Sequence, residues 1–427
     1  MFVTDTSLQD RFAARMGQLL GPEFPAQIGL AVSGGGDSMA MLTLAHNWTR
    51  DWGVRLRVVT VDHGLRPESA AEVEMVAREC AALGWPHDTL RWHGWDGQGN
   101  LQDAARRARL ALIDAWRGEM AHILFAHTLD DQAETVLMRL KRGSGVDGLS
   151  GMAETRRLSS GMVVLRPLLR ERREDLRHYL TTLKGHWVED PSNADPRFDR
   201  VRTRQVLALL SDYGLTPEGL VETASRMARA RTALMRRTGE AAARIVTEGA
   251  VDGRPTGDLW IARDGFAALD RETQLRLLAA GLGWIASASY RPRATALEAV
   301  LDRALAGGGG TLGGCELRVS KTHLHLFREF KAVATLSTPA VSGALWDTRW
   351  RLAASYPGLT LRALGPDGWG QLGETAKTGA CFAAARSLPA LFDDAGLVSC
   401  PVLGHGNPAE VAFGPVGGPF AAGFIPH

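Results

Sequence analysis

Cysteine is scarce in this chain, and long apolar runs are missing altogether. The four cysteines among 427 residues are Cys80, Cys315, Cys381 and Cys400. None stands in a Cys-x-x-Cys pair, so the sequence indicates neither a zinc site nor an iron–sulfur cluster, and reduced thiols are expected. The first ten residues lack a basic stretch followed by an apolar core, and no apolar run approaches membrane-spanning length. We therefore expect a cytoplasmic protein with no membrane partner.

An excess of charge of either sign is also missing. The 49 basic and 47 acidic residues give a formal net charge of +2. The total charge therefore does not indicate anionic partners, and only local clusters of basic residues can do so. An apolar content of 45% and a charged content of 22% are ordinary for a globular protein. The length predicts two or three domains.

A glycine loop near the N-terminus is the most informative stretch. An apolar run over residues 28–32 predicts a buried strand, and an apolar-periodic segment over 39–48 predicts a helix. Amides at such a helix start bind phosphate, and glycine lets the backbone approach it closely. Two serines add hydroxyl donors, and the second is also a candidate N-cap. The loop consists of Ser33, Gly34, Gly35, Gly36, Asp37 and Ser38.

This loop lacks the lysine that ends the common nucleotide-binding loop, Gly-x-x-x-x-Gly-Lys-Ser/Thr. Asp37 stands in the loop instead. A carboxylate among phosphates is repelled unless a divalent cation lies between them, so Asp37 predicts a magnesium site. The alternative is an ordinary glycine turn with a capping aspartate, and the strand–loop–helix context disfavours it.

Strands and helices alternate along the first half of the chain. Strands are predicted over 28–32, 56–61, 87–92 and 121–126, and helices over 39–48, 67–83, 101–116 and 130–141. The alternation predicts an α/β fold with a Rossmann-like parallel sheet. Ligands of such sheets bind beyond the carboxyl ends of the strands. Three polar segments follow strands directly, namely Ser33–Ser38, Asp62–Arg66 and His127–Asp131.

Acidic residues concentrate in the third of these segments. Asp130 and Asp131 begin a predicted helix, where its dipole stabilises them, but capping needs only one aspartate. Together with Glu134 they suit Mg²⁺, which binds a few carboxylates plus phosphate oxygens, and Asp37 and Asp131 are the predicted ligands. His127 is either a polar residue at a strand end or a substrate contact, and the neighbouring acids favour the contact.

The order of these motifs resembles a known family. The Ser-Gly-Gly-Gly-Asp-Ser loop is similar to the pyrophosphate loop of the ATP pyrophosphatases, whose other branches lack the later motifs. Over residues 27–204 the whole set resembles the bacterial tRNA(Ile)-lysidine synthetases. The later motifs are Asp62–Arg66, Asp130–Thr135, Arg139–Met152, Arg166–Leu169 and Asp190–Asn193.

The resemblance implies a ligase that modifies the wobble cytidine of an isoleucine tRNA with a CAU anticodon. ATP adenylates the C2 oxygen and pyrophosphate leaves; the ε-amine of L-lysine then attacks C2 and AMP leaves. The implied cofactors are ATP and Mg²⁺, and a homodimer is one expectation for the oligomeric state. The predicted catalytic residues are Asp37, Arg106, His127 and Asp131. The predicted ATP contacts are Ser33, Gly34, Gly35, Gly36, Asp37, Ser38, Asp62 and His63.

Arginines gather in places that the resemblance makes candidates for phosphate or tRNA contact. Arg106 and Arg109 lie three residues apart, on one face of a predicted helix. Arg200, Arg202 and Arg204 alternate, so they would share a face in an extended chain. The family often has Arg-Asn-x-Ile-Arg here, and the departures at 201 and 203 leave open which arginine acts; Arg200 and Arg204 are the candidates.

A predicted helix over residues 224–243 carries five arginines between positions 226 and 237 and no acid among them. Clustered arginines on a helix are the usual footprint of RNA backbone binding. Arg229 and Arg236 are the candidates here. The alternative for this helix and for the other basic segments is that their arginines are simply exposed to solvent and contact no RNA.

The rest of the chain predicts a mainly helical domain and then a small α+β domain. The expected divisions are 1–212 for catalysis, 213–331 for a helical tRNA-binding domain and 344–427 for a C-terminal tRNA-binding domain. Helices are predicted over 274–282 and 294–305, a hairpin over 316–327, and a linker over 332–343. Beyond the linker the sequence predicts few strands, and residues 414–427 predict an irregular tail.

Two other functions remain open. A tRNA thiolation enzyme of the same superfamily would share the first loop, although enzymes of that kind usually carry paired cysteines. A tRNA-binding protein with a vestigial ATP site is the second alternative, and the intact loop with Asp37 and Asp131 argues against it.

Overall fold

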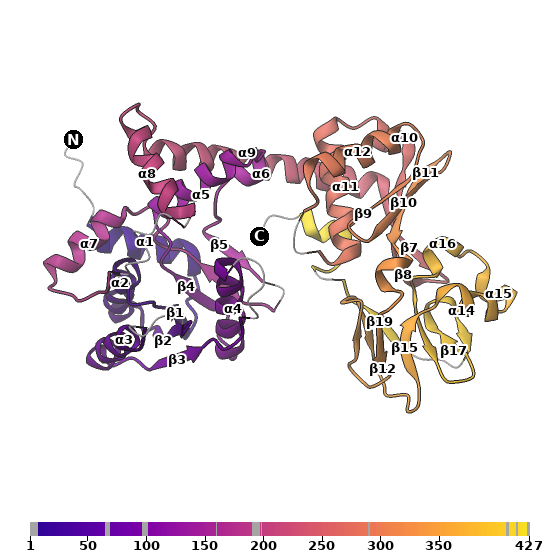
Figure 1. Ribbon diagram of the computed structural model, residues 1–427, viewed down its shortest axis with the longest axis horizontal. Coiled ribbons are helices and arrows are strands. Elements are labelled where there is room, and N and C mark those ends of the chain that lie inside the picture. The colour runs from indigo at the N-terminus through magenta and orange to yellow at the C-terminus, as the bar shows by residue number, and fades with distance from the viewer. Residues whose placement is uncertain are drawn as a thin grey trace. The chain divides into compact units, whose positions relative to one another are not determined.

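The structure is a computed structural model that describes residues 7–64, 69–95, 101–158, 160–189, 197, 199–288, 291–406, 410–415 and 417–424. The chain divides into two compact units, residues 1–231 and 232–427 (Figure 1). Within the described part of the chain, no helix is long and apolar enough to cross a membrane.

The first unit is built on a six-stranded sheet with the order β3-β2-β1-β4-β6-β5. All neighbouring strands are parallel except β5, which runs antiparallel to β6. The strands are β1 (Gln27–Ala31), β2 (Arg55–Asp62), β3 (His87–Arg91), β4 (His122–Phe125), β5 (Thr155–Arg157) and β6 (Val163–Leu165). The parallel sheet predicted from the sequence is confirmed.

Helices cover both faces of this sheet. The helices are α1 (Leu8–Leu20), α2 (Gly36–Trp52), α3 (Ser69–Leu83), α4 (Leu101–Trp116), α5 (Leu129–Lys141), α6 (Val146–Leu149), α7 (Arg173–Thr182) and α8 (Asp199–Ser211). Successive residues of β2 point to opposite faces, so Val58 joins a core with α1, α2, α3 and α7, whereas Val59 joins a core with Ile113 of α4. This double burial explains why the central strands β1 and β4 are nearly continuous apolar runs.

The long helix α9 (Pro217–Ile245) begins in the first unit and ends in the second. The second unit contains a five-stranded sheet with the order β7-β8-β11-β10-β9. Its strands are β7 (Val246–Val251), β8 (Arg254–Ala262), β9 (Gly310–Leu312), β10 (Cys315–Val319) and β11 (His323–Arg328), and its helices are α10 (Arg263–Ala267), α11 (Arg271–Ala286) and α12 (Ala294–Leu305). The predicted helices and the β10–β11 hairpin are confirmed.

The prediction of few strands after residue 343 is wrong. Two small sheets follow, with the orders β12-β15-β16-β17-β18 and β13-β14-β19. Each strand is only two to four residues long, too short for visible alternation of polar and apolar residues. The elements are α13 (Phe330–Val333), β12 (Ser337–Pro339), β13 (Leu345–Trp346), β14 (Trp350–Leu352), β15 (Thr360–Ala363), α14 (Gly365–Gln371), α15 (Glu374–Lys377), α16 (Phe382–Ala385), β16 (Pro389–Phe392), β17 (Leu397–Cys400), η2 (Pro401–Leu403), β18 (His405–Gly406) and β19 (Val411–Phe413).

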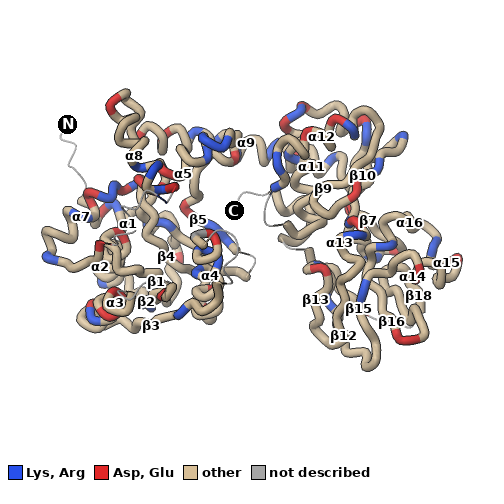
Figure 2. Tube along the Cα trace, viewed as in Figure 1, with Lys and Arg blue, Asp and Glu red and all other residues tan. Residues whose placement is uncertain are grey.

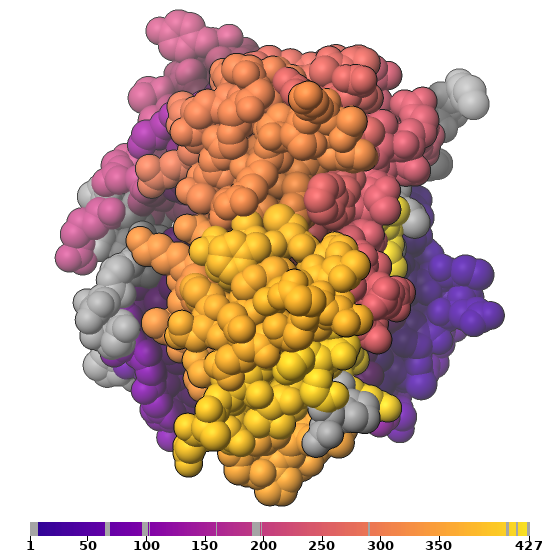
Figure 3. All heavy atoms as spheres, turned by 90° about the vertical axis from the view of Figure 1, so that its right-hand side faces the viewer, coloured from indigo at the N-terminus to yellow at the C-terminus, as the bar shows by residue number. Residues whose placement is uncertain are grey.

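The C-terminal segment is packed into the second unit, and the prediction of an irregular tail is wrong for its described residues. Phe420 and Phe424 in the short helix η3 (Phe420–Phe424) are buried in the core that contains α11 and α12. The Trp284 indole N–H also donates to the Gly418 carbonyl (3.0 Å). Figure 3 shows one face of this unit, on which orange and yellow segments adjoin.

The segment predicted as a linker, residues 332–343, contains β12 and the buried side chains of Val333 and Ala340. It is therefore part of the folded second unit. The division into three domains at residues 212, 331 and 344 stays a prediction.

Candidate active site

The glycine loop connects β1 to α2, and two serines close it. Ser38 Oγ accepts a hydrogen bond from the Ser33 amide (3.1 Å) and donates one to the Gly35 carbonyl (2.9 Å). Gly34 has a φ of +87°, which a residue with a side chain rarely adopts. Because α2 begins at Gly36 with Gly35 as N-cap, the prediction that Ser38 caps the helix is wrong. The first amides of α2 have no intrahelical acceptors, so this helix end suits an anion.

The loop after β4 opens beside the glycine loop, because β1 pairs with β2 on one side and with β4 on the other. Crevices at such a reversal of strand order are the usual ligand sites of parallel sheets. A capping box starts α5: the Asp131 amide donates to Thr128 Oγ1 (3.3 Å), and Asp131 Oδ2 accepts from the Thr128 amide (3.0 Å). One oxygen of Asp131 is thereby occupied, and the other, Oδ1, accepts a hydrogen bond from Arg173 (3.1 Å).

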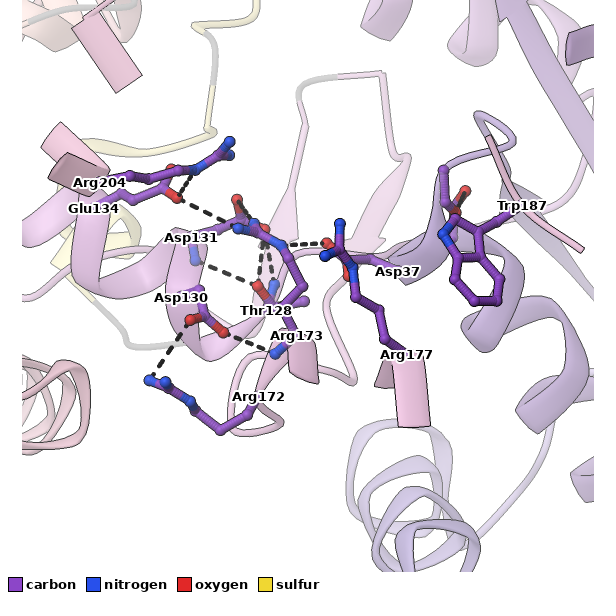
Figure 4. A network of polar contacts seen from close by, with 12 residues as sticks. Asp37, Thr128, Asp130, Asp131, Glu134, Arg172, Arg173, Arg177, Trp187 and Arg204 are labelled. Carbon is purple, nitrogen blue, oxygen red and sulfur yellow. Dashed lines mark hydrogen bonds and ion pairs between the residues drawn. The ribbon is translucent and has the colours of Figure 1, made fainter. Parts of the chain in front are cut away.

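Arg173 lies between the two loops and bridges their carboxylates (Figure 4). Its Nε donates to Asp37 Oδ2 (3.0 Å) and its Nη2 to Asp131 Oδ1 (3.1 Å). Its Nη1 lies 3.7 Å from Glu134 Oε1. Arg173 is the first residue of α7, and its backbone amide donates to Asp130 Oδ2 (2.8 Å). A single guanidinium therefore joins the carboxylates at the carboxyl ends of β1 and β4.

The three carboxylates have different acidities because their surroundings differ. Burial raises the pKa of Asp37 above its ordinary value, although Arg173 counteracts this. Burial also acts to raise the pKa of Asp131, but Arg173 and the hydrogen bond from Thr128 outweigh it, so the net shift is downward. Burial raises the pKa of Glu134, and the charge of Asp131 adds to this. Asp131 is thus the most stable anion of the three.

Arg204 pairs with Glu134, with 2.6 Å between Arg204 Nε and Glu134 Oε1. The face that an extended chain would give to Arg200, Arg202 and Arg204 does not exist, because residues 199–211 form α8. Arg200 and Arg204 are one helical turn apart and share a face, whereas Arg202 is exposed and pairs with Asp199. The helix thus separates Arg202 from the other two arginines.

A second group of charges surrounds His127. Burial lowers the pKa of His127 to about 3, so the imidazole is neutral at pH 7, and its Nδ1 has no hydrogen-bond partner within the described residues. Arg109 lies over the Phe125 ring (5.3 Å to its centroid), and burial with the charges of Arg106 and Arg200 lowers the pKa of Arg109 to about 10. The structure therefore brings the predicted residues Arg106, Arg109, Arg200 and His127 into one positively charged neighbourhood.

Asp62 is the last residue of β2, and His63 follows it. Asp62 Oδ1 accepts from the Gly64 amide (2.9 Å), which is the main cause of its lowered pKa. The His63 ring meets Trp92 edge to face (5.7 Å between centroids), and burial lowers the pKa of His63. Leu65, Arg66 and the motif at 190–193 lie outside the described residues.

The motif at 139–152 folds the chain back onto α5. Arg139 Nη1 donates to the carbonyls of Gly148 and Gly151 (2.8 Å each). The Gln132 side chain donates to the Met152 carbonyl (2.8 Å) and accepts from its amide (2.6 Å). Gly151 has a φ of +67°, and a Cβ there would meet the Gln132 amide at 2.7 Å. This motif supports the helix that carries Asp131 rather than contributing to its acid cluster.

Arg229 and Arg236 are exposed on α9, among the basic residues visible along that helix in Figure 2. No acidic partner for either is found within the part of the chain that the structure describes. Arg226 and Arg237, in contrast, pair with Glu222 and Asp270. Arg229 and Arg236, the two named from the sequence, are therefore solvated, and their contact with tRNA stays a prediction.

The sequence pattern does not identify Arg173 or its neighbour Arg172 as site residues. Arg172 pairs with Asp130 and Glu218 at 3.5 and 3.1 Å. The same pattern predicts Glu134 only as a member of the acid cluster that suits Mg²⁺. The available signal was the Arg172–Arg173 pair, which follows the Arg166–Leu169 motif after two residues and stands at the start of a helix. Nothing in the local pattern shows which carboxylates they meet.

Asp37 and Asp131 fit a magnesium ion, because the structure already directs both carboxylates at one cationic group. No three His, Cys, Asp or Glu side chains within the described residues could hold a metal by themselves. Mg²⁺ usually keeps one or two carboxylates and takes its other ligands from phosphate and water, so a two-carboxylate site beside a phosphate loop suits it.

A parallel sheet with a glycine–aspartate loop at its reversal point is the architecture of a nucleotide-dependent α/β enzyme. A family model described as a PP-loop domain matches residues 8–210. Curated relatives extend the match beyond this domain. A tRNA(Ile)-lysidine synthase of Ruegeria pomeroyi is 45% identical over 90% of this chain and 90% of its own length. The chain belongs to the tRNA(Ile)-lysidine synthase family.

Other relatives with the same name agree. The protein of Wolbachia pipientis wMel is 35% identical over 76% of both chains. That of Methylobacterium nodulans is 42% identical over 75% of this chain and 96% of its own. Among solved structures, the U34-tRNA thiolase NcsA from Methanococcus maripaludis aligns with a TM-score of 0.44 at 15% identity, over 51% of this chain and 78% of that one. This last likeness adds nothing to the assignment.

Proposed function

We propose that this protein converts the wobble cytidine of an isoleucine tRNA with a CAU anticodon into lysidine, using ATP and L-lysine. The observation that supports the proposal is that Asp37, from the phosphate loop, and Asp131, from the start of α5 after β4, both contact the Arg173 guanidinium. For a chain of the tRNA(Ile)-lysidine synthase family, we infer that the triphosphate and the amine meet at this position.

In the first step the C2 oxygen of cytidine attacks the α-phosphorus of ATP, and the bond to pyrophosphate breaks. The amides at the start of α2 receive the pyrophosphate, whose developing charge they stabilise without reorganisation. Mg²⁺ held by Asp37 and Asp131 would supply further charge neutralisation there. Asp62 and His63 remain the proposed contacts to the rest of the nucleotide.

In the second step the lysine ε-amine attacks C2, and the bond from C2 to the oxygen of AMP breaks. Lysine arrives as an ammonium ion, since its unperturbed pKa is about 10.4. The Asp131 carboxylate pairs with the ammonium, and a carboxylate of the same cluster takes the proton as the amine attacks. Neutral His127 and the arginines Arg106 and Arg109 face the adenylated base and its phosphate.

Two features disfavour the alternatives. Burial raises the pKa of Cys80, Cys315 and Cys400 to about 12, so these three thiols are not thiolates at neutral pH and do not suit thiolation chemistry. A vestigial ATP site would have no need for the ion pairs that keep Asp37 and Asp131 aligned. The homodimer stays a prediction that light scattering can check.

The direct test is incubation of the protein with ATP, Mg²⁺, labelled L-lysine and total bacterial tRNA, followed by nucleoside analysis. Labelled lysidine in an isoleucine tRNA is the expected product. Asp37→Asn protein is the matched control, because it keeps the side-chain shape and removes the charge. A sulfur-containing nucleoside formed in place of lysidine, or ATP-independent tRNA binding without any product, would contradict the proposal.

A further inference from the structure

We propose that Arg173 holds the place of the divalent cation in the free protein and has to leave Asp37 and Asp131 before Mg²⁺–ATP binds. The inference rests on the proposed function, since it assumes that these two carboxylates are the magnesium ligands. It assigns Arg173 as a positioning residue that competes with the metal.

The competition follows from which oxygens are available. Asp131 Oδ2 already accepts hydrogen bonds from the Thr128 amide (3.0 Å) and hydroxyl (3.2 Å). Only Asp131 Oδ1 remains for a metal, and that oxygen accepts from Arg173 Nη2 (3.1 Å). The metal and the guanidinium therefore need the same atom.

The second ligand is contested in the same way. Asp37 Oδ2 accepts from Arg173 Nε (3.0 Å). The guanidinium is planar and spans both carboxylates at once, so it matches the gap that a bridging cation would fill. Glu134 Oε1 lies 3.7 Å from Arg173 Nη1, so a third carboxylate is also next to the guanidinium.

Charge balance explains why such an occupant is needed. Burial raises the pKa of both Asp37 and Glu134, so unneutralised carboxylates are costly here. Arg173 neutralises them while no metal is bound. Once a divalent ion takes over that role, the guanidinium lies beside residues 33–38 and can pair with the pyrophosphate instead.

Arg177 provides a matched control. It lies one helical turn further along α7, is half exposed, and its Nη2 pairs with Glu189 at 2.9 Å. Figure 4 shows it on the same side of the network, next to Asp37, without a bond to the carboxylates. Arg177→Met therefore removes the same charge from the same helix without freeing either metal ligand.

The experiment is titration of the nucleotide-free protein with Mn²⁺, following the free-ion electron paramagnetic resonance signal at pH ~8, where exposed carboxylates are ionised. Arg173→Met should lower the Kd of Mn²⁺ by about tenfold or more, the size expected when a competing charge-assisted pair is removed. Arg177→Met removes a charge that acts on Asp37 only through space, so it should lower the Kd by much less than Arg173→Met does. Adding Asp37→Asn to Arg173→Met should abolish the gain. Circular dichroism verifies that each variant is folded.

An unchanged or higher Kd in Arg173→Met would overturn the inference, and so would an equal gain in Arg177→Met. This failure is distinct from failure of the proposed function. Wild-type protein that makes lysidine while Arg173→Met binds Mn²⁺ no more tightly would leave the proposed function intact and refute only the competition. Protein that makes no lysidine would refute the function, and the titration would still decide whether Arg173 competes with the ion.

Discussion

Replacement of Asp131 separates the support of α5 from the chemistry of the amine, because its two oxygens have different partners. Oδ2 belongs to the capping box with Thr128, and Oδ1 faces Arg173. Asp131→Asn can keep an oxygen on the Thr128 amide while losing the charge. Asp131→Ala loses both. The two variants should therefore be equally poor catalysts but differ in stability.

The expected changes in stability and in rate follow from these two sets of partners. Loss of the helix cap in Asp131→Ala should cost about 1 kcal/mol, which lowers the melting temperature by roughly 2–4 °C for a unit of this size. Asp131→Asn keeps the cap but, like Asp131→Ala, loses the ion pair with Arg173, so it should melt roughly 2–4 °C above Asp131→Ala. Loss of the ammonium's partner should slow lysine incorporation by about 100-fold or more in both variants.

A single-turnover assay distinguishes the two steps by following AMP-linked tRNA and lysine incorporation separately. If Asp131 serves the amine, lysine incorporation falls more than adenylation, and adenylated tRNA accumulates. If both steps fall together while lysine affinity is unchanged, the amine role is refuted and Asp131 is a metal ligand only. Equal melting temperatures of the two variants would refute the argument from the capping box.

Three further predictions use other parts of the structure. Asp37→Asn should reduce pyrophosphate release by about 100-fold or more, as measured by ATP–pyrophosphate exchange, because electrostatic support of the leaving group is lost. Replacing Arg229 and Arg236 by Gln should lower the slope of log Kd for tRNA against log salt by roughly 0.7 to 0.9 for each phosphate that the protein no longer neutralises, whereas replacing the ion-paired Arg226 should have little effect. Between pH 6.5 and about 3 the unfolded chain protonates His127 while the folded chain does not, so acidification should destabilise wild type more than His127→Gln in thermal melts.

Most of the first unit could be predicted because its local patterns agree with its tertiary structure. The strands are buried on both faces, so β1, β2 and β4 appear as continuous apolar runs, and the loops after them carry the polar residues. The position of Asp37 and Asp131 at one sheet edge follows from this topology alone. The short edge strand β5, fully exposed, has no such signal.

The arginine partners could not be predicted because they come from distant segments. Arg173 meets Asp37, 136 residues away, and Arg204 meets Glu134, 70 residues away. Residues 200–204 show an alternation of arginines that is equally compatible with a strand, and only burial of Val201 and Leu207 within the first unit selects the helix. In the C-terminal segment, glycine and proline turns break the chain into strands too short to show a period.

The structure also distinguishes the carboxylates of the acid cluster by their pKa shifts, which the sequence motif does not reveal. Asp131 has a lowered pKa, which makes it a good partner for an ammonium ion but a poor proton acceptor. Glu134 is the better proton acceptor of the two, because burial and the neighbouring Asp131 raise its pKa. Its Oε2 also has no hydrogen-bond partner within the described residues. Pairs of carboxylates whose surroundings push their pKa values apart usually take different roles. If the proposed amine step is right, we expect Asp131 to hold the ammonium and Glu134, one helical turn further into α5, to take the proton that the amine loses as it attacks C2.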